Sequence, residues 1–142
     1  MVRELIYNAI AEALNYFDDS IYCSQVYELR PKSVPCAFIE QISKVRVREY
    51  ADLNNTDHQH RLTFEVQVIG NSLSYAYEMM GVVEDTFQDL SFFEDMCEQI
   101  DNADITLSRI VARFSAQVDD DELISRLTES DQPSGATGLT GA

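Results

Sequence analysis

Residues 60–89, HRLTFEVQVIGNSLSYAYEMMGVVEDTFQD, contain the passage that decides the fold. Over residues 60–69, apolar and polar side chains alternate, which is the pattern of a strand with one buried face. Gly70 ends this strand, and Asn71 is placed to cap a helix over residues 72–89. A strand that leads directly into an amphipathic helix predicts a layered domain in which helix and sheet share one core.

The predicted helix carries two apolar stripes, although a helix that lies on one sheet needs only one buried face. The core stripe comprises Leu73, Ala76, Tyr77, Met80, Val83, Phe87 and Leu90. The second stripe consists of Tyr75, Met79 and Val82. This second stripe either widens the core contact or forms a subunit interface, because Tyr and Met are enriched at such surfaces.

Upstream, residues 36–50 are predicted to pair with residues 60–69 as an antiparallel hairpin with a polar tip at 52–59. The apolar residues Ala37, Ile39, Val45 and Val47 share one parity, and the basic residues Lys44, Arg46 and Arg48 share the other. The stretch is longer than an ordinary strand, so we expect it to bend near Ser43 or to project as an arm.

Four further elements complete the predicted domain. Helical spacing predicts a helix over residues 2–17, and a short strand follows at 21–27. Residues 96–100 form a candidate short strand. Residues 105–118 form a strand whose apolar parity changes, which a bulge near Ser108 would explain.

These elements predict an α+β fold. It has a mixed, mostly antiparallel sheet of four to five strands, two helices on one face, a long hairpin arm and an extended C-terminal tail. The domain covers residues 1–118. Residues 119–142 are acidic at first and then rich in Gly, Ser and Thr, a composition that cannot bury a core. A short helical turn at residues 123–127 is the only element expected there.

The composition excludes several classes of partner. The 142 residues are 45% hydrophobic and carry a formal net charge of −15. Tight nucleic-acid binding and docking on an anionic membrane both require basic surface, so neither is expected. No apolar run approaches the ~20 residues that span a membrane. Cys23, Cys36 and Cys97 are widely spaced, which favours buried free thiols in a chain made in the cytosol.

The charge is unevenly distributed along the chain. Residues 78–104 hold nine acidic residues and no basic one, whereas residues 30–61 hold six basic residues against four acidic ones. Two ordinary solvated faces are the default explanation. The alternative is a head-to-tail contact in which the basic strand of one copy meets the acidic segment of the next. This hypothesis assigns the interface to Lys44, Arg46, Arg48, Tyr75, Met79, Val82, Glu84, Asp85, Glu94 and Asp95.

No motif for catalysis or phosphate binding is present in the sequence. Asp57, His58 and His60 could ligate a transition metal, but no fourth ligand stands at a recognisable spacing, so we expect a solvated loop. We therefore expect no enzyme activity, no catalytic residue, no metal and no cofactor.

Four segments together resemble one protein family. They are ELIYNAIAEALNYF at residues 4–17, PCAFIE at 35–40, the strand and helix quoted above, and RIVARFSAQVDDD at 109–121. In element order, length and hydrophobic texture, residues 1–118 are similar to the tail terminator (tail completion) proteins of long-tailed bacteriophages.

The resemblance implies a structural virion protein, made in the host cytoplasm, that forms a hexameric ring at the head–tail interface. In that family the ring caps the tail tube, stops its polymerisation and provides the surface that the head connector joins. The implied partners are further copies, the tail tube protein and the head–tail connector or neck proteins. DNA passes through the lumen without specific binding, and no membrane is involved. The acidic C-terminal segment and the long polar hairpin tip depart from the family pattern.

Two other classes of function stay open at this point. The chain could be another neck or head-completion adaptor, or a tube subunit that polymerises without limit. A small cytosolic enzyme or ligand-binding domain would instead require a concave apolar pocket with convergent polar groups.

Overall fold

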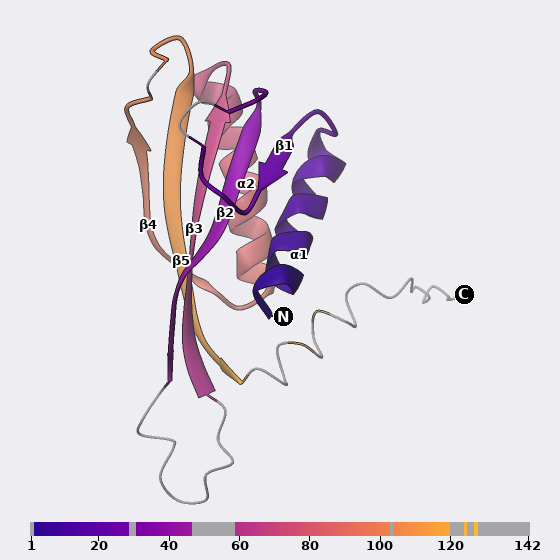
Figure 1. The fold of residues 1–142 in the computed structure, drawn as a ribbon, viewed down its shortest axis with the longest axis vertical. Coiled ribbons are helices and arrows are strands. Elements are labelled where there is room, and N and C mark those ends of the chain that lie inside the picture. The colour runs from indigo at the N-terminus through magenta and orange to yellow at the C-terminus, as the bar shows by residue number, and fades with distance from the viewer. Residues whose placement is uncertain are drawn as a thin grey trace, which may run out of the picture.

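A computed structural model describes residues 2–28, 31–46, 59–102 and 104–119, together with Ile124 and Leu127. The elements are α1 (Val2–Phe17), β1 (Tyr22–Ser24), β2 (Cys36–Arg46), β3 (Gln59–Gly70), α2 (Leu73–Asp89), β4 (Phe93–Ile100) and β5 (Ser108–Asp119). The strands form one sheet in the order β1-β2-β3-β5-β4 (Figure 1). β1 runs parallel to β2, and the other three pairs are antiparallel. The predicted α+β fold is confirmed.

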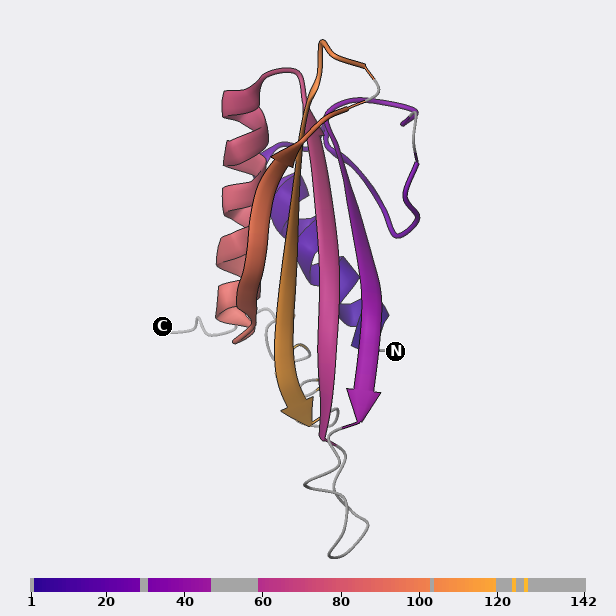
Figure 2. The same ribbon diagram turned by 90° about the vertical axis from the view of Figure 1, so that its left-hand side faces the viewer.

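Both helices lie on one face of the sheet (Figures 1 and 2). Helical spacing places Ile6, Ile10 and Leu14 of α1 on one side, where they are fully buried. From α2, the ring of Phe87 stacks on Phe114 of β5, with 4.3 Å between the ring centroids. The alternation of β3 and β5 supplies the other half of this core.

α2 differs from its prediction at its start and in its buried surface. Ser72, not Asn71, is the N-cap, because its side chain accepts a hydrogen bond from the backbone N–H of Tyr75 at 3.2 Å. Leu73 and Tyr77 of the predicted core stripe are exposed, whereas Met79 of the second stripe is fully buried. The reason is that α1 packs beside α2, so the buried arc of α2 turns toward both the sheet and α1.

β2 changes face at a bulge between Gln41 and Ser43, close to the predicted bend. Before the bulge, Ala37 and Ile39 face the helices, as expected. After it, Lys44 stands opposite the buried Leu62, on the helix side, while Val45 turns to the other face and is 55% exposed. The predicted division into one dry and one basic face is therefore wrong beyond the bulge. The ends of β2, β3 and β5 extend past the helices (Figure 2). Because β5 pairs with β3 as far as Gln59, this end belongs to the sheet and is not a separate arm, and the predicted hairpin tip at 52–59 lies almost entirely outside the described residues.

The boundaries of the last two strands also correct the prediction. β4 begins at Phe93 rather than at residue 96, and β5 begins at Ser108. Ile105 lies in the preceding turn and is 93% exposed, so the change of parity marks the start of the strand and not a bulge.

Among the described residues, those that cover the face of the sheet opposite the helices lie near β1. There Cys36, Phe38 and Ile69 form a small second core. Arg109 is buried beside it, donates from Nε to Asn102 Oδ1 at 2.9 Å, and places its guanidinium 5.1 Å from the centre of the Tyr27 ring. These contacts hold the segment after β1 against the sheet.

The hydrophobic core extends beyond the predicted domain boundary at residue 118. Leu127 is only 3% exposed and belongs to the main core. It lines a hollow between the two helices together with Leu5, Ala9 and Leu90. At least this residue of the predicted tail therefore packs with the domain, since α1 and α2 leave an apolar seam between them.

Leu127→Ala should lower the free energy of unfolding by about 2 kcal/mol, because it removes a buried side chain from this seam. Urea denaturation of the full chain measures the change. Ile105→Ala, at an exposed position, is the matched control and should change stability by less than about 0.5 kcal/mol. Equal losses in the two variants would contradict the packing of Leu127.

Candidate subunit interface

β4 forms an open edge of the sheet. Within the described ranges it pairs only with β5, and six of its eight residues are exposed. It carries Glu94, Asp95 and Glu98 and no basic residue, and its first residue, Phe93, is 77% exposed. Charged side chains on an edge strand prevent two identical edges from pairing, because like charges would stand opposite each other.

An open groove of about 570 Å³ separates the beginning of β4 from the last turns of α2. Phe92 and Phe114 line its base and are buried. Glu84 and Asp85 of α2 line it from one side and Glu94 of β4 from the other. An aromatic floor with carboxylates around it suits a cationic side chain with an apolar stem.

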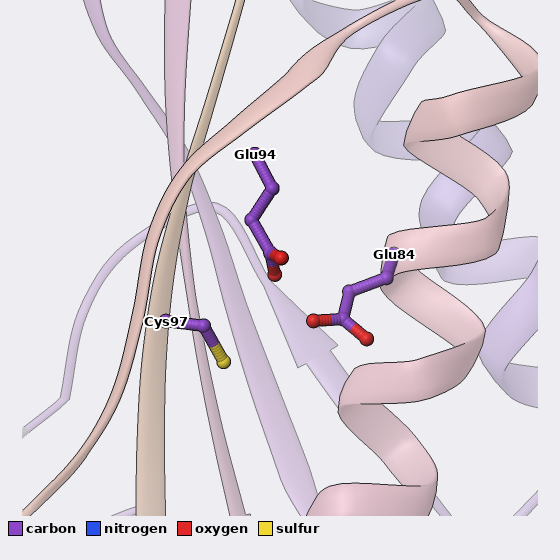
Figure 3. Close-up of side chains that lie close together, drawn as sticks. All are labelled: Glu84, Glu94 and Cys97. Atoms are coloured by element: carbon purple, nitrogen blue, oxygen red, sulfur yellow. The ribbon is translucent and has the colours of Figure 1, made fainter.

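Glu84, Glu94 and Cys97 converge at this groove from α2 and β4 (Figure 3). One carboxylate oxygen of each glutamate and the cysteine Sγ all lie within 4.8 Å of one another. A hydrogen bond between the two carboxyl groups, partial burial, and the negative charges of Glu94 and Asp85 raise the pKa of Glu84 to about 7. At pH 7 a large share of the Glu84 carboxyl groups is therefore protonated.

The thiol of Cys97 stays protonated in this surrounding. Partial desolvation and the two nearby carboxylates raise its pKa to about 11. Contrary to the prediction of a buried thiol, Cys97 is exposed, whereas Cys36 is buried. Two carboxylates and a thiol are three donors, and no fourth His, Cys, Asp or Glu joins them among the residues that the structure describes. Structural zinc sites have four ligands, so the cluster falls short of one.

A second open edge lies on the far side of the sheet. β1 pairs only with Cys36, Ala37 and Phe38, so in the described part of the chain the rest of β2 has no strand on its outer side. Lys44 is exposed here, and Ile42 and Val45 expose apolar side chains beside it. The two open edges of one sheet thus carry opposite charge.

The structure gathers some of the predicted interface residues and separates others. Glu84, Asp85 and Glu94 meet at the groove, and Asp95 follows on the same edge. Lys44 and the backbone of Arg46 lie on the opposite edge. The description does not include the Arg46 side chain, nor any part of Arg48, Asp57 or His58.

The second apolar stripe of α2 packs against the core of its own subunit. Met79 lies in the core, and Tyr75 and Val82 pack against that core. The Tyr75 hydroxyl donates a hydrogen bond to Asp18, and its ring lies 5.9 Å from that of Phe17. The wider core contact is therefore the interpretation that the structure supports for this stripe.

Sequence reasoning missed the exposed apolar residues at the two edges. Phe93 follows the buried Phe92, and strand alternation necessarily turns one of two adjacent rings outward. Ile42 and Val45 were assigned no surface role because the bulge that exposes them is visible only in the strand register. Cys97 lies beside Glu84 only because α2 packs next to β4, and no local sequence pattern indicates that packing.

Comparison with known proteins does not extend this description. No protein-family model matches the sequence, and no curated protein matches it significantly. Among the described residues, no helix is both long and apolar enough to cross a membrane.

Glu84→Gln should flatten the dependence of stability on pH. The folded-state pKa of about 7 exceeds the ordinary value of 4.5, so the proton on Glu84 stabilises the fold fully below pH 4.5. That contribution is lost as the pH rises through 7. Solvent screening limits it to roughly 1 kcal/mol between pH 5 and 8.

Urea unfolding of both proteins at several pH values between 5 and 8 tests this expectation. Asp89→Asn, an exposed carboxylate at the end of the same helix, is the control and should keep the slope. A Glu84→Gln variant with the same slope as the unaltered chain would show that the pKa of Glu84 is not raised in the folded state.

Proposed function

We propose that this chain is a structural subunit of a bacteriophage virion. Copies of it form a ring at the head-proximal end of a tail tube, end the polymerisation of the tube, and provide the surface that the head connector joins. The observation that supports this proposal is the pair of open sheet edges with opposite charge, β4 and the end of β2.

Edges of this kind favour head-to-tail assembly. Pairing β4 with another β4 brings carboxylates together, and pairing two β2 ends brings basic residues together. Pairing β4 with β2 joins unlike surfaces on different parts of the subunit, and such heterologous contacts close into a ring when the rotation allows. Opposite charge also speeds association and sets the alignment of the copies.

The resemblance of residues 1–118 to tail terminators supports the place of this ring in the virion. The expected order of helices and strands, on which that resemblance depends, is present in the fold. A net charge of −15 suits a passage for DNA, since each basic contact in a lumen would bind phosphate and retain the DNA.

Added to tail tubes that were assembled without it, the purified chain should produce a new density at one end of each tube and stop further elongation. Negative-stain images and tube-length distributions measure both effects. Long tubes of the chain alone would instead indicate a tube subunit, and binding to connectors without binding to tubes would indicate a neck adaptor. A chain that stays monomeric and binds neither partner contradicts the proposal.

Arg46→Glu combined with Arg48→Glu should weaken self-association at least tenfold, because it reverses two charges of the basic sequence segment that ends β2 and continues beyond it. Light scattering over a range of protein concentrations measures the effect. Arg3→Glu combined with Lys32→Glu changes the net charge equally at exposed positions outside β2 and β4 and should assemble normally. Unchanged assembly of the Arg46 and Arg48 variant would refute the role of this segment.

A further inference from the structure

We infer that β4 of one copy pairs with residues 42–46 of β2 in the next copy, as antiparallel strands in a single register. In that register Phe93 stands opposite Val45 of the next copy, and Glu94 stands opposite Lys44. A continuous sheet then crosses each boundary between subunits. This inference rests on the proposed head-to-tail ring and specifies its contact.

The strand directions require an antiparallel pair. Within one copy, β2 is antiparallel to β3, β3 to β5, and β5 to β4, so β4 runs opposite to β2. Rotation about a ring axis from which the strands are moderately tilted keeps the up or down sense of each strand. The two edges therefore meet as antiparallel strands, which pair slightly more strongly than parallel ones.

The faces of the four side chains select the partners. Lys44 stands opposite Leu62, and Glu94 stands opposite Phe114, so both point to the helix side of the sheet. Residues directly opposite each other in an antiparallel pair share a face. A lysine and a carboxylate that could neutralise each other therefore already lie on the same side of the two edges.

The apolar pair lies on the other face. Val45 stands opposite Arg61, and Phe93 stands opposite Ser115, away from the helices. One step forward along β4 is one step backward along an antiparallel partner, so Phe93 with Val45 and Glu94 with Lys44 belong to the same register. This register covers two of the exposed apolar side chains while it pairs two opposite charges.

The required alignment is close to the one that the subunit already has. Ser43 pairs with Thr63, Thr63 pairs with Ser115, and Ser115 pairs with Phe93. Phe93 therefore lies level with Ser43 of its own copy. The proposed register moves the contact only from Ser43 to Val45. A stagger of this kind arises from the strand tilt when a sheet closes on itself.

The groove gives the Lys44 side chain a place to bind. On the helix side, Glu94 borders the groove that Glu84 and Asp85 line from α2. An ammonium group that arrives with β2 of the next copy meets these carboxylates over the aromatic floor. Its charge offsets the repulsion within the acidic cluster, which each isolated subunit must otherwise tolerate.

Disulfide trapping tests the register. Phe93→Cys and Val45→Cys are combined in a chain that also carries Cys97→Ser, so that the exposed native thiol does not react. Both replaced side chains are exposed, so the fold should tolerate the changes. Oxidation with diamide should give a ladder of covalent oligomers on non-reducing gels, because directly opposite strand residues have the separation that a disulfide needs.

The matched control carries Glu98→Cys in place of Phe93→Cys and keeps Val45→Cys and Cys97→Ser. Glu98 is exposed on the same face of β4, but it lies five residues further along the strand. At about 3.4 Å per residue it stands beyond reach of Val45, so no ladder should form. Equal trapping of the two pairs would overturn the register.

Charge exchange tests the second pair. Glu94→Lys or Lys44→Glu alone should weaken self-association at least tenfold, and the two together should restore it. Glu98→Lys makes the same change of charge on β4, and Lys44→Glu should not rescue it. Absence of rescue at Glu94 would overturn the pairing.

The outcomes separate this inference from the proposed function. If rings form on tubes but Phe93→Cys and Val45→Cys do not form a disulfide, the proposed ring is supported and the strand pairing is refuted. A chain that forms no oligomer in solution or on tubes would refute both.

Discussion

The packing of Phe87 of α2 on Phe114 of β5 is the contact on which the rest of the structure depends. It holds α2 over the centre of the sheet, where β3 and β5 supply the apolar face. The chain then turns through Ser91, which has a φ of 67°, and Phe92 returns to the same aromatic cluster, 5.1 Å from Phe87. β4 consequently begins beyond the end of α2, at the edge of the sheet.

This position of β4 creates the surface features that bear on function. An edge strand with one neighbour leaves its outer backbone groups without a strand partner, and Glu94, Asp95 and Glu98 protect it from identical edges. The space between β4 and α2 becomes the groove in which Glu84 faces Glu94 and its pKa is raised to about 7. On the other side of the sheet, the shortness of β1 leaves the basic end of β2 open in the same manner. A single open sheet keeps these two edges apart, so the proposed contact between them requires two copies.

Much of the fold could be predicted because its elements have strong periodicity. Helix 2–17 and the hairpin of β2 and β3 follow from repeats of 3.6 and 2 residues, which a single sequence displays. The exceptions each depend on a neighbour distant in the sequence. Met79 is buried because α1 packs beside α2, Leu127 because the two helices leave a seam, and Lys44 changes face because one residue is inserted into the ladder with β3. For the candidate interface, the sequence pointed to the acidic and basic segments, but Phe93 and Val45 became visible only in the strand register.

Local periodicity and charge can be read residue by residue, so they were sufficient to predict the α+β class, the order of the elements and the separation of acidic from basic segments. The packed fold adds that these segments lie on opposite open edges of one sheet. It also shows that Glu84 and Glu94 face each other across a groove, and that Lys44 and Glu94 share one face. Strand order and register arise from pairing between segments far apart in the chain, and no local pattern encodes which edge is left without a partner.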